Sequence, residues 1–422
     1  MSDLSDLVSL SREAGSRVDY VQAGGGNTSV KLDDGYMAIK ASGYLLKEMT
    51  ESYGFVAVDG VLLSKYFEQG RFEQPQSAKD PQVMLERNRL EQDVPEQTLC
   101  EHPQSEQTQS EQTQPLQKDL NKESMDIAIA SIKPIGGEAF ARPSVEIGFH
   151  SILQKFVLHL HPVYAAVLLC SSGGMEKFYG ILEAEGIGCV MVPYIMPGYE
   201  LTAMIRDGAA EYERRTGEKP KVILMKNHGV ITTAQTAGEA LALMHAVNNA
   251  VIRALSLPAF VGEFMPVQDA QAEKEQDAKP PLGNSQGGKT PVDNSQDATP
   301  PRLYSLRECA DGYECAQFPE ALRNPDIATA CGRSALYPDQ LVYIYDEVGL
   351  NEEDGKKITI GDRILYRSGE KEAAAMHETL LGVAYVHGCI ASMGLDPELL
   401  SDGECAQILG WDSEKYRRSL MK

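Results

Sequence analysis

The feature that most constrains the fold is a regular alternation of helical and strand patterns between residues 125 and 258. Stretches with apolar residues at helical spacing alternate with short apolar runs rich in β-branched residues. The expected helices are 144–155, 175–185, 201–216 and 237–255, and the expected strands are 157–170, 188–194 and 222–232. Because such alternation is typical of a sheet covered by helices, we predict an α/β fold for this part.

The blocks on either side have patterns of their own. Residues 1–72 predict an N-terminal helix followed by a β-meander, in which YMAIKAS and YGFVAVD are strands and GGGN and LDDG are turns. In residues 303–422, LVYIYDEV and RILYR have strand patterns, and a helix is expected from about Lys371 to Met393. We expect this C-terminal extension to pack on the rest of the chain, and no motif in it indicates chemistry.

Two polar tracts interrupt these patterns, at residues 73–124 and 262–302, and the first contains the tandem SEQTQSEQTQ. Such tracts bury too little apolar surface to offset the entropy of ordering, so we predict that both are disordered. The predicted organisation is one domain over residues 1–258, interrupted by the insertion at 73–124. The linker and the C-terminal extension, 303–422, follow it.

Charge and composition exclude several classes of protein. A formal net charge of −22 argues against a nucleic-acid partner or an anionic membrane surface, both of which need clustered Lys and Arg. No stretch approaches the ~18 apolar residues of a membrane span, and the N-terminus has no apolar signal region. We therefore predict a cytoplasmic protein. The eight scattered cysteines, without a CxxC pair, then predict reduced thiols.

The candidate metal ligands are three histidines. In an extended strand, His159 and His161 point to the same face, at a spacing that suits two imidazoles about 2.0–2.1 Å from one ion. An HxH pair alone fits a buried polar pair equally well. His228, at the end of a β-rich run and directly before Gly229, adds a third ligand. Three histidines with a position left open are typical of catalytic zinc, so we predict Zn²⁺ or another divalent metal.

Glu146 begins the helix that leads into the HxH strand. It fits a fourth ligand or a catalytic base, and it fits equally a first-turn acid placed favourably on the helix dipole. The remaining candidates are the isolated helical histidines His150, His245, His377 and His387, which we predict to be structural.

Two loops are candidates for anion binding. The run from Gly24 to Ser29, GGGNTS, could turn backbone N–H groups toward phosphate oxygens, with Lys31 and Lys40 adding charge. Ser42 and Gly43 end a strand nearby. A plain turn is the alternative for both loops. Because no GxGxxG follows a strand, we predict no nicotinamide or nucleotide cofactor.

Taken in order, GGGNTSVK, MAIKASGYLL, RPSVEIGFH, VLHLHP and LMKNHGVI resemble the class II aldolase/adducin family. The resemblance is closest to the aldolase portion of the rhamnulose-1-phosphate aldolase-like branch. It implies a three-layer α/β/α sandwich around a mainly antiparallel sheet, a zinc held by three histidines, and a homo-oligomer, often a tetramer. Carried residue by residue, it places the metal on His159, His161 and His228 and the catalytic carboxylate on Glu146.

The resemblance also implies a phosphate pocket and a reaction. The pocket residues would be Gly26, Asn27, Ser42, Gly43 and Ser144. The reaction would be reversible aldol cleavage of a ketose 1-phosphate, a small phosphorylated sugar, to dihydroxyacetone phosphate and an aldehyde. Alternatives within the family are a sugar-phosphate epimerase, dehydratase or decarboxylase, and a non-catalytic scaffold of the adducin type. The chain departs from the family at Val145, where relatives carry a small hydroxyl residue, and none of its tyrosines can be assigned as a proton donor.

Overall fold

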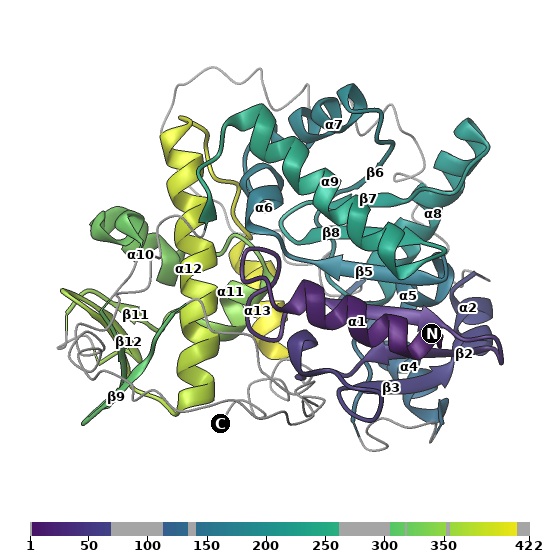
Figure 1. Cartoon of the computed structure of the whole chain (residues 1–422), viewed down its shortest axis with the longest axis horizontal. Helices are drawn as coiled ribbons and strands as arrows, with labels where there is room; N and C mark the ends of the chain where they lie inside the picture. Colours follow the sequence, from purple (N-terminus) through teal and green to yellow (C-terminus); the bar gives the residue numbers. More distant parts are fainter. Residues whose placement is uncertain are drawn as a thin grey trace, which may run out of the picture.

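An eight-stranded sheet forms the centre of the chain in the computed structural model, which describes residues 2–68, 113–133, 141–260, 304–316, 319–351 and 355–411 (Figure 1). The strand order is β4-β3-β2-β1-β5-β8-β7-β6, and every neighbouring pair is antiparallel except β6 with β7. The strands are β1 Asn27–Lys31, β2 Tyr36–Lys40, β3 Phe55–Asp59, β4 Ile132–Lys133, β5 Phe156–Leu160, β6 Val190–Val192, β7 Val222–Met225 and β8 Gly229–Ala234.

Helices cover both faces of this sheet, and its strands are therefore buried on both sides. Along β5, Leu158 and Leu160 enter one apolar cluster and Val157 enters another, as the alternation of strand side chains requires. The first face is covered by α1 Asp3–Gly15, α6 Val163–Leu169 and α9 Ala237–Leu255, while α7 Gly174–Ala184 and α12 Glu370–Ser392 pack against α6. The second is covered by α2 Gly60–Glu68, α4 Thr113–Ala130, α5 Ile147–Ile152 and α8 Tyr199–Thr216. The predicted three-layer α/β/α sandwich is therefore confirmed.

The C-terminal part adds a small sheet and several helices, and α12 packs beside α6 in the same apolar cluster (Figure 1). The sheet order is β11-β12-β13-β10-β9. These strands are β9 Arg307–Cys309, β10 Gly312–Cys315, β11 Val348–Gly349, β12 Ile358–Ile360 and β13 Ile364–Tyr366. The helices besides α12 are α10 Pro325–Arg333, α11 Pro338–Tyr343 and α13 Asp402–Gly410, and the single turns η1 Leu46–Glu48 and η5 Glu320–Arg323 are 3₁₀-helices.

Three predicted strands are wrong in extent or type. The strand expected at 157–170 ends at Leu160, and Pro162 caps helix α6 instead. The strand expected at 222–232 is a hairpin, β7 and β8, around Asn227. The run LVYIYDEV, residues 341–348, begins in helix α11, which spans Pro338–Tyr343, continues as a turn, and reaches strand β11 only at Val348. The run at 157–170 is buried throughout, so its apolar residues show no period that would distinguish a helix from a strand.

Two other boundaries differ from prediction. The helix expected at 144–155 is shorter, because α5 spans only Ile147–Ile152. Residues 113–124, predicted to be disordered, belong to helix α4, whose Asn121 side chain accepts a hydrogen bond from the backbone N–H of Tyr199. The remainder of the insertion, 73–112, and the linker lie outside the described residues. The predicted helices at 175–185, 201–216, 237–255 and 371–393 are confirmed.

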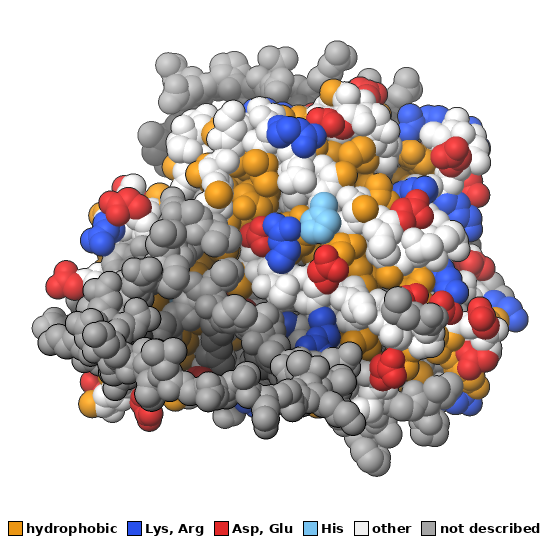
Figure 2. All heavy atoms as spheres, viewed as in Figure 1, with side chains coloured by type: hydrophobic (Ala, Val, Ile, Leu, Met, Phe, Trp, Pro, Cys, Tyr) orange, Lys and Arg blue, Asp and Glu red, His pale blue; other side chains and the backbone are white. Residues whose placement is uncertain are grey.

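The surface is mixed on the face drawn in Figure 2, where acidic and basic side chains are interspersed rather than gathered in one patch. In the described part of the chain, no helix is long and apolar enough to cross a membrane. The seven cysteines within that part are free thiols.

Candidate metal centre and its pocket

The three predicted histidines converge where β5 and the β7–β8 turn meet. His159 lies in β5, His161 follows its end, and His228 lies in the turn beyond β7. One ligand atom of each lies within 4.8 Å of the others, and all three side chains are buried. Nε2 of His159 and Nε2 of His161 are 3.0 Å apart. Two nitrogens bound to one tetrahedral zinc would lie roughly 3.3 Å apart, so this spacing fits a shared ion.

The hydrogen bonds on the other side of the two rings support the same conclusion. Nδ1 of His159 faces the backbone oxygen of Val230 at 3.3 Å, and Nδ1 of His161 faces a carboxylate oxygen of Asp339 at 2.5 Å. In both contacts Nδ1 is the donor, which leaves a lone pair on each Nε2. Two lone pairs 3.0 Å apart repel unless a cation lies between them. The donor set therefore fits a divalent metal.

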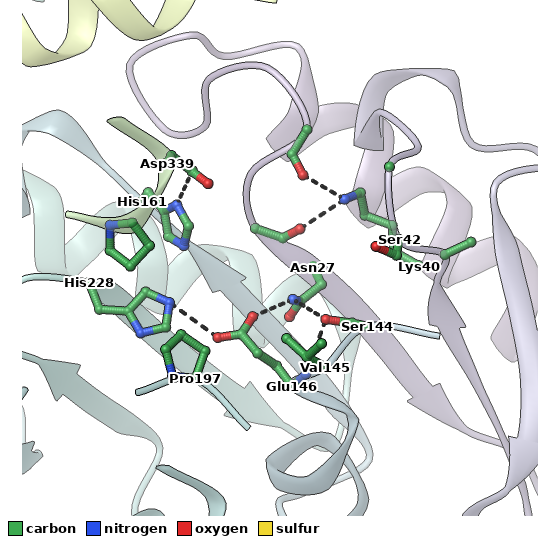
Figure 3. A pocket seen from close by; sticks show the side chains of 15 residues that line it. Asn27, Lys40, Ser42, Ser144, Val145, Glu146, His161, Pro197, His228 and Asp339 are labelled. Atoms are coloured by element: carbon green, nitrogen blue, oxygen red, sulfur yellow. Dashed lines mark hydrogen bonds and ion pairs between the residues drawn. The ribbon is translucent and has the colours of Figure 1, made fainter. Parts of the chain in front are cut away.

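Glu146 faces the same point as a carboxylate. Its Oε1 lies 3.1 Å from Nε2 of His228 (Figure 3). Its Oε2 lies 3.5 Å from Nε2 of His159. Burial raises the pKa of Glu146, but the neighbouring histidines and a hydrogen bond from Asn27 outweigh it and hold that pKa well below its ordinary value. Burial lowers the pKa of His159 well below its ordinary value. His159 is thus a neutral imidazole beside an ionised carboxylate, and metal ligation requires these two protonation states.

Asn27 connects Glu146 to the interior of the fold. Its side-chain N–H donates to Oε2 of Glu146 at 2.7 Å and to Oγ of Ser144 at 3.2 Å. Its side-chain oxygen contacts Nε2 of His150, whose Nδ1 lies 2.7 Å from Oγ of Ser29. Burial lowers the pKa of His150 to about 3, so this ring is neutral. His150, predicted to be structural, therefore orients the residue that holds the carboxylate.

The predicted phosphate residues surround one pocket next to these histidines. Gly26, Asn27, Ser42, Gly43 and Ser144 all line it, together with Lys40, Glu146, His161 and His228. Buried Lys40 donates to the backbone oxygens of Gly24 and Gly26 at 2.9 and 3.1 Å (Figure 3). Lys31 is elsewhere: its ammonium group donates to backbone oxygens at the end of α5, including that of His150 at 2.9 Å. Burial lowers the pKa of Lys31 to about 7.

The glycine loop differs from an open nest of N–H groups. The N–H of Ala23 donates to Glu378 at 2.8 Å, that of Gly24 to the hydroxyl of Tyr343 at 3.3 Å, and that of Gly25 to the backbone oxygen of Gln22 at 3.0 Å. These three groups therefore serve to hold the loop in place. The part of the loop that lines the pocket is Gly24, Gly26 and Asn27.

The C-terminal extension also contributes side chains to the site, which no sequence motif predicted. Asp339, Tyr343 and Glu378 reach the histidines or the glycine loop from α11 and α12, although no motif there indicated chemistry. The available signal was the pair Pro338-Asp339, a helix start with an acid inside an otherwise apolar run. His377 lies elsewhere, against Tyr366, and His245 contacts Tyr20, so both are outside the pocket. No tyrosine is among the described residues that line the pocket.

Comparison with known proteins finds a family-model match for the central segment. The family model described as "Class II Aldolase and Adducin N-terminal domain" matches residues 113–254. A relative from Bacillus subtilis (strain 168), named uncharacterized oxidoreductase YuxG, is 33% identical over 97 residues, which are 23% of this chain and 13% of that protein. The matched segment thus spans about an eighth of the length of that relative.

Solved structures similar to this chain include the N-terminal class II aldolase domain of a conserved protein from Thermoplasma acidophilum, with 22% identity, coverage of 60% of this chain and 94% of that chain, and a TM-score of 0.40. A sugar-phosphate aldolase from Thermotoga maritima has 15% identity, coverage of 59% and 95%, and a TM-score of 0.35. L-Fuculose-1-phosphate aldolase from Thermus thermophilus has 14% identity, coverage of 60% and 94%, and a TM-score of 0.32. The family-model match, over residues 113–254, shows that this segment of the chain is similar to the class II aldolase and adducin family.

Proposed function

We propose that this protein is a metal-dependent carbon–carbon lyase that reversibly cleaves a ketose 1-phosphate to dihydroxyacetone phosphate and an aldehyde. The observation that carries the proposal is the pair of facing Nε2 atoms of His159 and His161, 3.0 Å apart, with an oxygen acceptor behind each ring. Glu146 and His228 complete the set of ligand atoms. Similarity to the class II aldolase family supports this chemistry for the same residues.

His159, His161 and His228 would hold the ion, and Zn²⁺ is the ion that this donor set favours. A bound divalent ion would act as a Lewis acid on oxygen atoms of the substrate. Glu146 would return a proton to the carbon next to the carbonyl after cleavage, and would remove that proton in the direction of synthesis. Its depressed pKa keeps it ionised at neutral pH, so it is in the form that can accept a proton.

The substrate phosphate would lie against Gly26, Asn27, Ser42, Gly43 and Ser144. Lys40, buried beneath the loop, places a positive charge on the same side of the pocket. Asn27 connects the proposed phosphate pocket with the catalytic carboxylate, because it lines this pocket and also donates to Glu146. The reacting carbon and the phosphate of a small sugar would therefore be held by neighbouring groups.

A first experiment tests the metal site. Elemental analysis of the purified chain is expected to find about one zinc or similar ion per chain, and a variant with both His159→Ala and His161→Ala is expected to lack it. An absence of stoichiometric metal from the wild type, even after reconstitution, would overturn the lyase proposal and favour a scaffold of the adducin type.

A second experiment tests the reaction without knowledge of the aldehyde. The metal-loaded protein, incubated with dihydroxyacetone phosphate in D₂O, is expected to exchange one hydrogen on the carbon next to the carbonyl, as read by proton NMR. Glu146→Gln is expected to abolish exchange and keep the metal. Metal binding without exchange would contradict aldol chemistry and point to an epimerase, dehydratase or decarboxylase at the same site. The cytoplasmic location and the homo-oligomeric, tetrameric state stay predictions of the sequence.

A further inference from the structure

The C-terminal extension contacts the candidate metal centre through one carboxylate. Oδ2 of Asp339 lies 2.5 Å from Nδ1 of His161, across 178 positions of sequence. Asp339 is 1% exposed and His161 is 7% exposed. Figure 3 shows Asp339 entering from the extension on the opposite side of the imidazole from His228 and Glu146.

This contact fixes which nitrogen of His161 carries the proton. A buried carboxylate accepts a hydrogen bond and cannot donate one while ionised, so Nδ1 must be the protonated nitrogen. Nε2 then presents its lone pair to Nε2 of His159 and to the pocket. Such a carboxylate behind a ligating histidine orients the ring and raises its basicity.

The glycine loop leaves room for the contact. A Cβ added to Gly25 would lie 2.3 Å from Oδ2 of Asp339 and 3.2 Å from Nδ1 of His161. Any side chain at this position would therefore push the carboxylate and the imidazole apart. The absence of a side chain at Gly25 thus makes room for the contact between Asp339 and His161, and Gly25 is not among the residues that line the proposed phosphate pocket.

Gln340, the residue after Asp339, helps to fix the position of helix α11. The side chain of Gln340 accepts from the backbone N–H of Leu336 at 2.8 Å and donates to the backbone oxygens of Cys331 and Ser334 at 2.8 and 3.1 Å. These bonds hold the helix to the segment before it.

We infer that Asp339 is a positioning residue for the metal centre: it holds His161 in the tautomer and orientation that bind the ion. This inference rests on the metal site proposed above. It gives the C-terminal extension a role in metal affinity. Residues 113–254 hold the three histidines, but they lack the Asp339 carboxylate that orients His161.

The test compares zinc affinities measured by competition with a chromophoric chelator. Asp339→Ala is expected to weaken binding by about 10- to 100-fold. Gly25→Ala, which retains the carboxylate but displaces it, is expected to weaken binding in the same direction. The matched control is Glu314→Gln, which removes a buried carboxylate of the extension that pairs with Arg307 and Arg363 away from the pocket. It is expected to lower the melting temperature and leave the zinc affinity unchanged.

A second measurement, the absorption spectrum of bound Co²⁺, distinguishes a role in positioning His161 from a loss of the fold. Co²⁺ bound to the wild type is expected to give the d–d absorption of a nitrogen-rich site, and Asp339→Ala or Gly25→Ala should shift that spectrum while Glu314→Gln does not. Equal affinity and identical spectra for the wild type and both variants would overturn the inference alone. A wild-type chain that binds no metal would overturn the proposed function and the inference with it.

Discussion

The side-chain amide of Asn27 donates a 2.7 Å hydrogen bond to Oε2 of Glu146, while Nε2 of His228 lies 3.1 Å from Oε1 of the same carboxylate. The two oxygens of Glu146 are therefore held from different elements, β1 and the β7–β8 turn. This arrangement fixes the direction in which the carboxylate can exchange a proton.

Asn27→Ala is expected to slow the hydrogen exchange of dihydroxyacetone phosphate by about 10- to 100-fold, because a hydrogen bond to a charged group contributes roughly 1.5–3 kcal/mol. The measurement is the NMR exchange rate at saturating metal. Asn248→Ala is the control, since Asn248 is equally buried but bonds within α9, to the backbone oxygen of Met244 at 2.9 Å. A wild-type rate in Asn27→Ala would show that Glu146 is oriented without it.

Two buried histidines of α12 predict a loss of stability in acid. Burial lowers the pKa of His377 to about 3 and that of His387 to about 4, from 6.5 in the unfolded chain. Between these values the unfolded chain binds the protons and the folded chain does not, so stability falls as pH falls below 6.5. Each histidine contributes about 1.4 kcal/mol per pH unit.

The variant His377→Gln is expected to reduce the slope of stability against pH by one proton, because it removes one titrating imidazole. Gln can still accept from the hydroxyl of Tyr366, so the local packing is expected to be kept. Urea unfolding at about pH 4.5, 5.5, 6.5 and 7.5, a series that brackets the ordinary histidine pKa, measures the slope. His245→Gln is the comparison, because the His245 side chain is only partly buried. If both substitutions left the slope unchanged, acid lability would have to come from other groups.

Gly229 follows His228 at the start of β8, and a Cβ there would lie 2.4 Å from the backbone oxygen of Leu160 and 2.8 Å from Cδ2 of His161. Gly229→Ala is therefore expected to cost about 1–3 kcal/mol, the usual range for overpacking, and to weaken zinc binding. Gly238→Ala is the matched control, because a Cβ at this helical glycine meets nothing within 4 Å. It is expected to raise the free energy of unfolding slightly. Thermal unfolding with and without zinc would measure both.

Asn227 turns the chain between β7 and β8 with a φ of 50°, and its side chain donates to the backbone oxygens of Leu336 and Glu398 at 2.9 and 2.6 Å. Both Asn227→Gly and Asn227→Ala lose these bonds, but only alanine adds strain in the left-handed region. We expect Asn227→Ala to be less stable than Asn227→Gly by about 1 kcal/mol. Urea unfolding of the pair is the measurement, and the reverse order would contradict it.

The three candidate metal ligands could be predicted from the sequence because the spacing of His159 and His161 follows a local rule. Alternation along a strand places His159 and His161 on one face whatever surrounds them, and the structure brings both to His228. The extent of the strand was not accessible, because Val163 to Leu169 is buried all round as a helix and its apolar run has no polar face to reveal the period.

Asp339 could not be identified from the sequence for a different reason. Its partner lies 178 positions away, and a carboxylate that supports a ligand leaves no spacing pattern of its own. The same holds for Glu378 and Tyr343, which contact the glycine loop from α12 and α11. Only the packing of the extension on α6 and on the loop places these groups at the site.

The contact between His161 and Asp339 also sets an order of events during synthesis. All three histidines are added to the chain more than a hundred residues before Asp339. Over that interval, nothing from the extension fixes the proton on His161. A nascent chain can therefore fold its central sheet first. The proposed metal site would reach its full affinity only after the C-terminal extension has been synthesised and has packed against it.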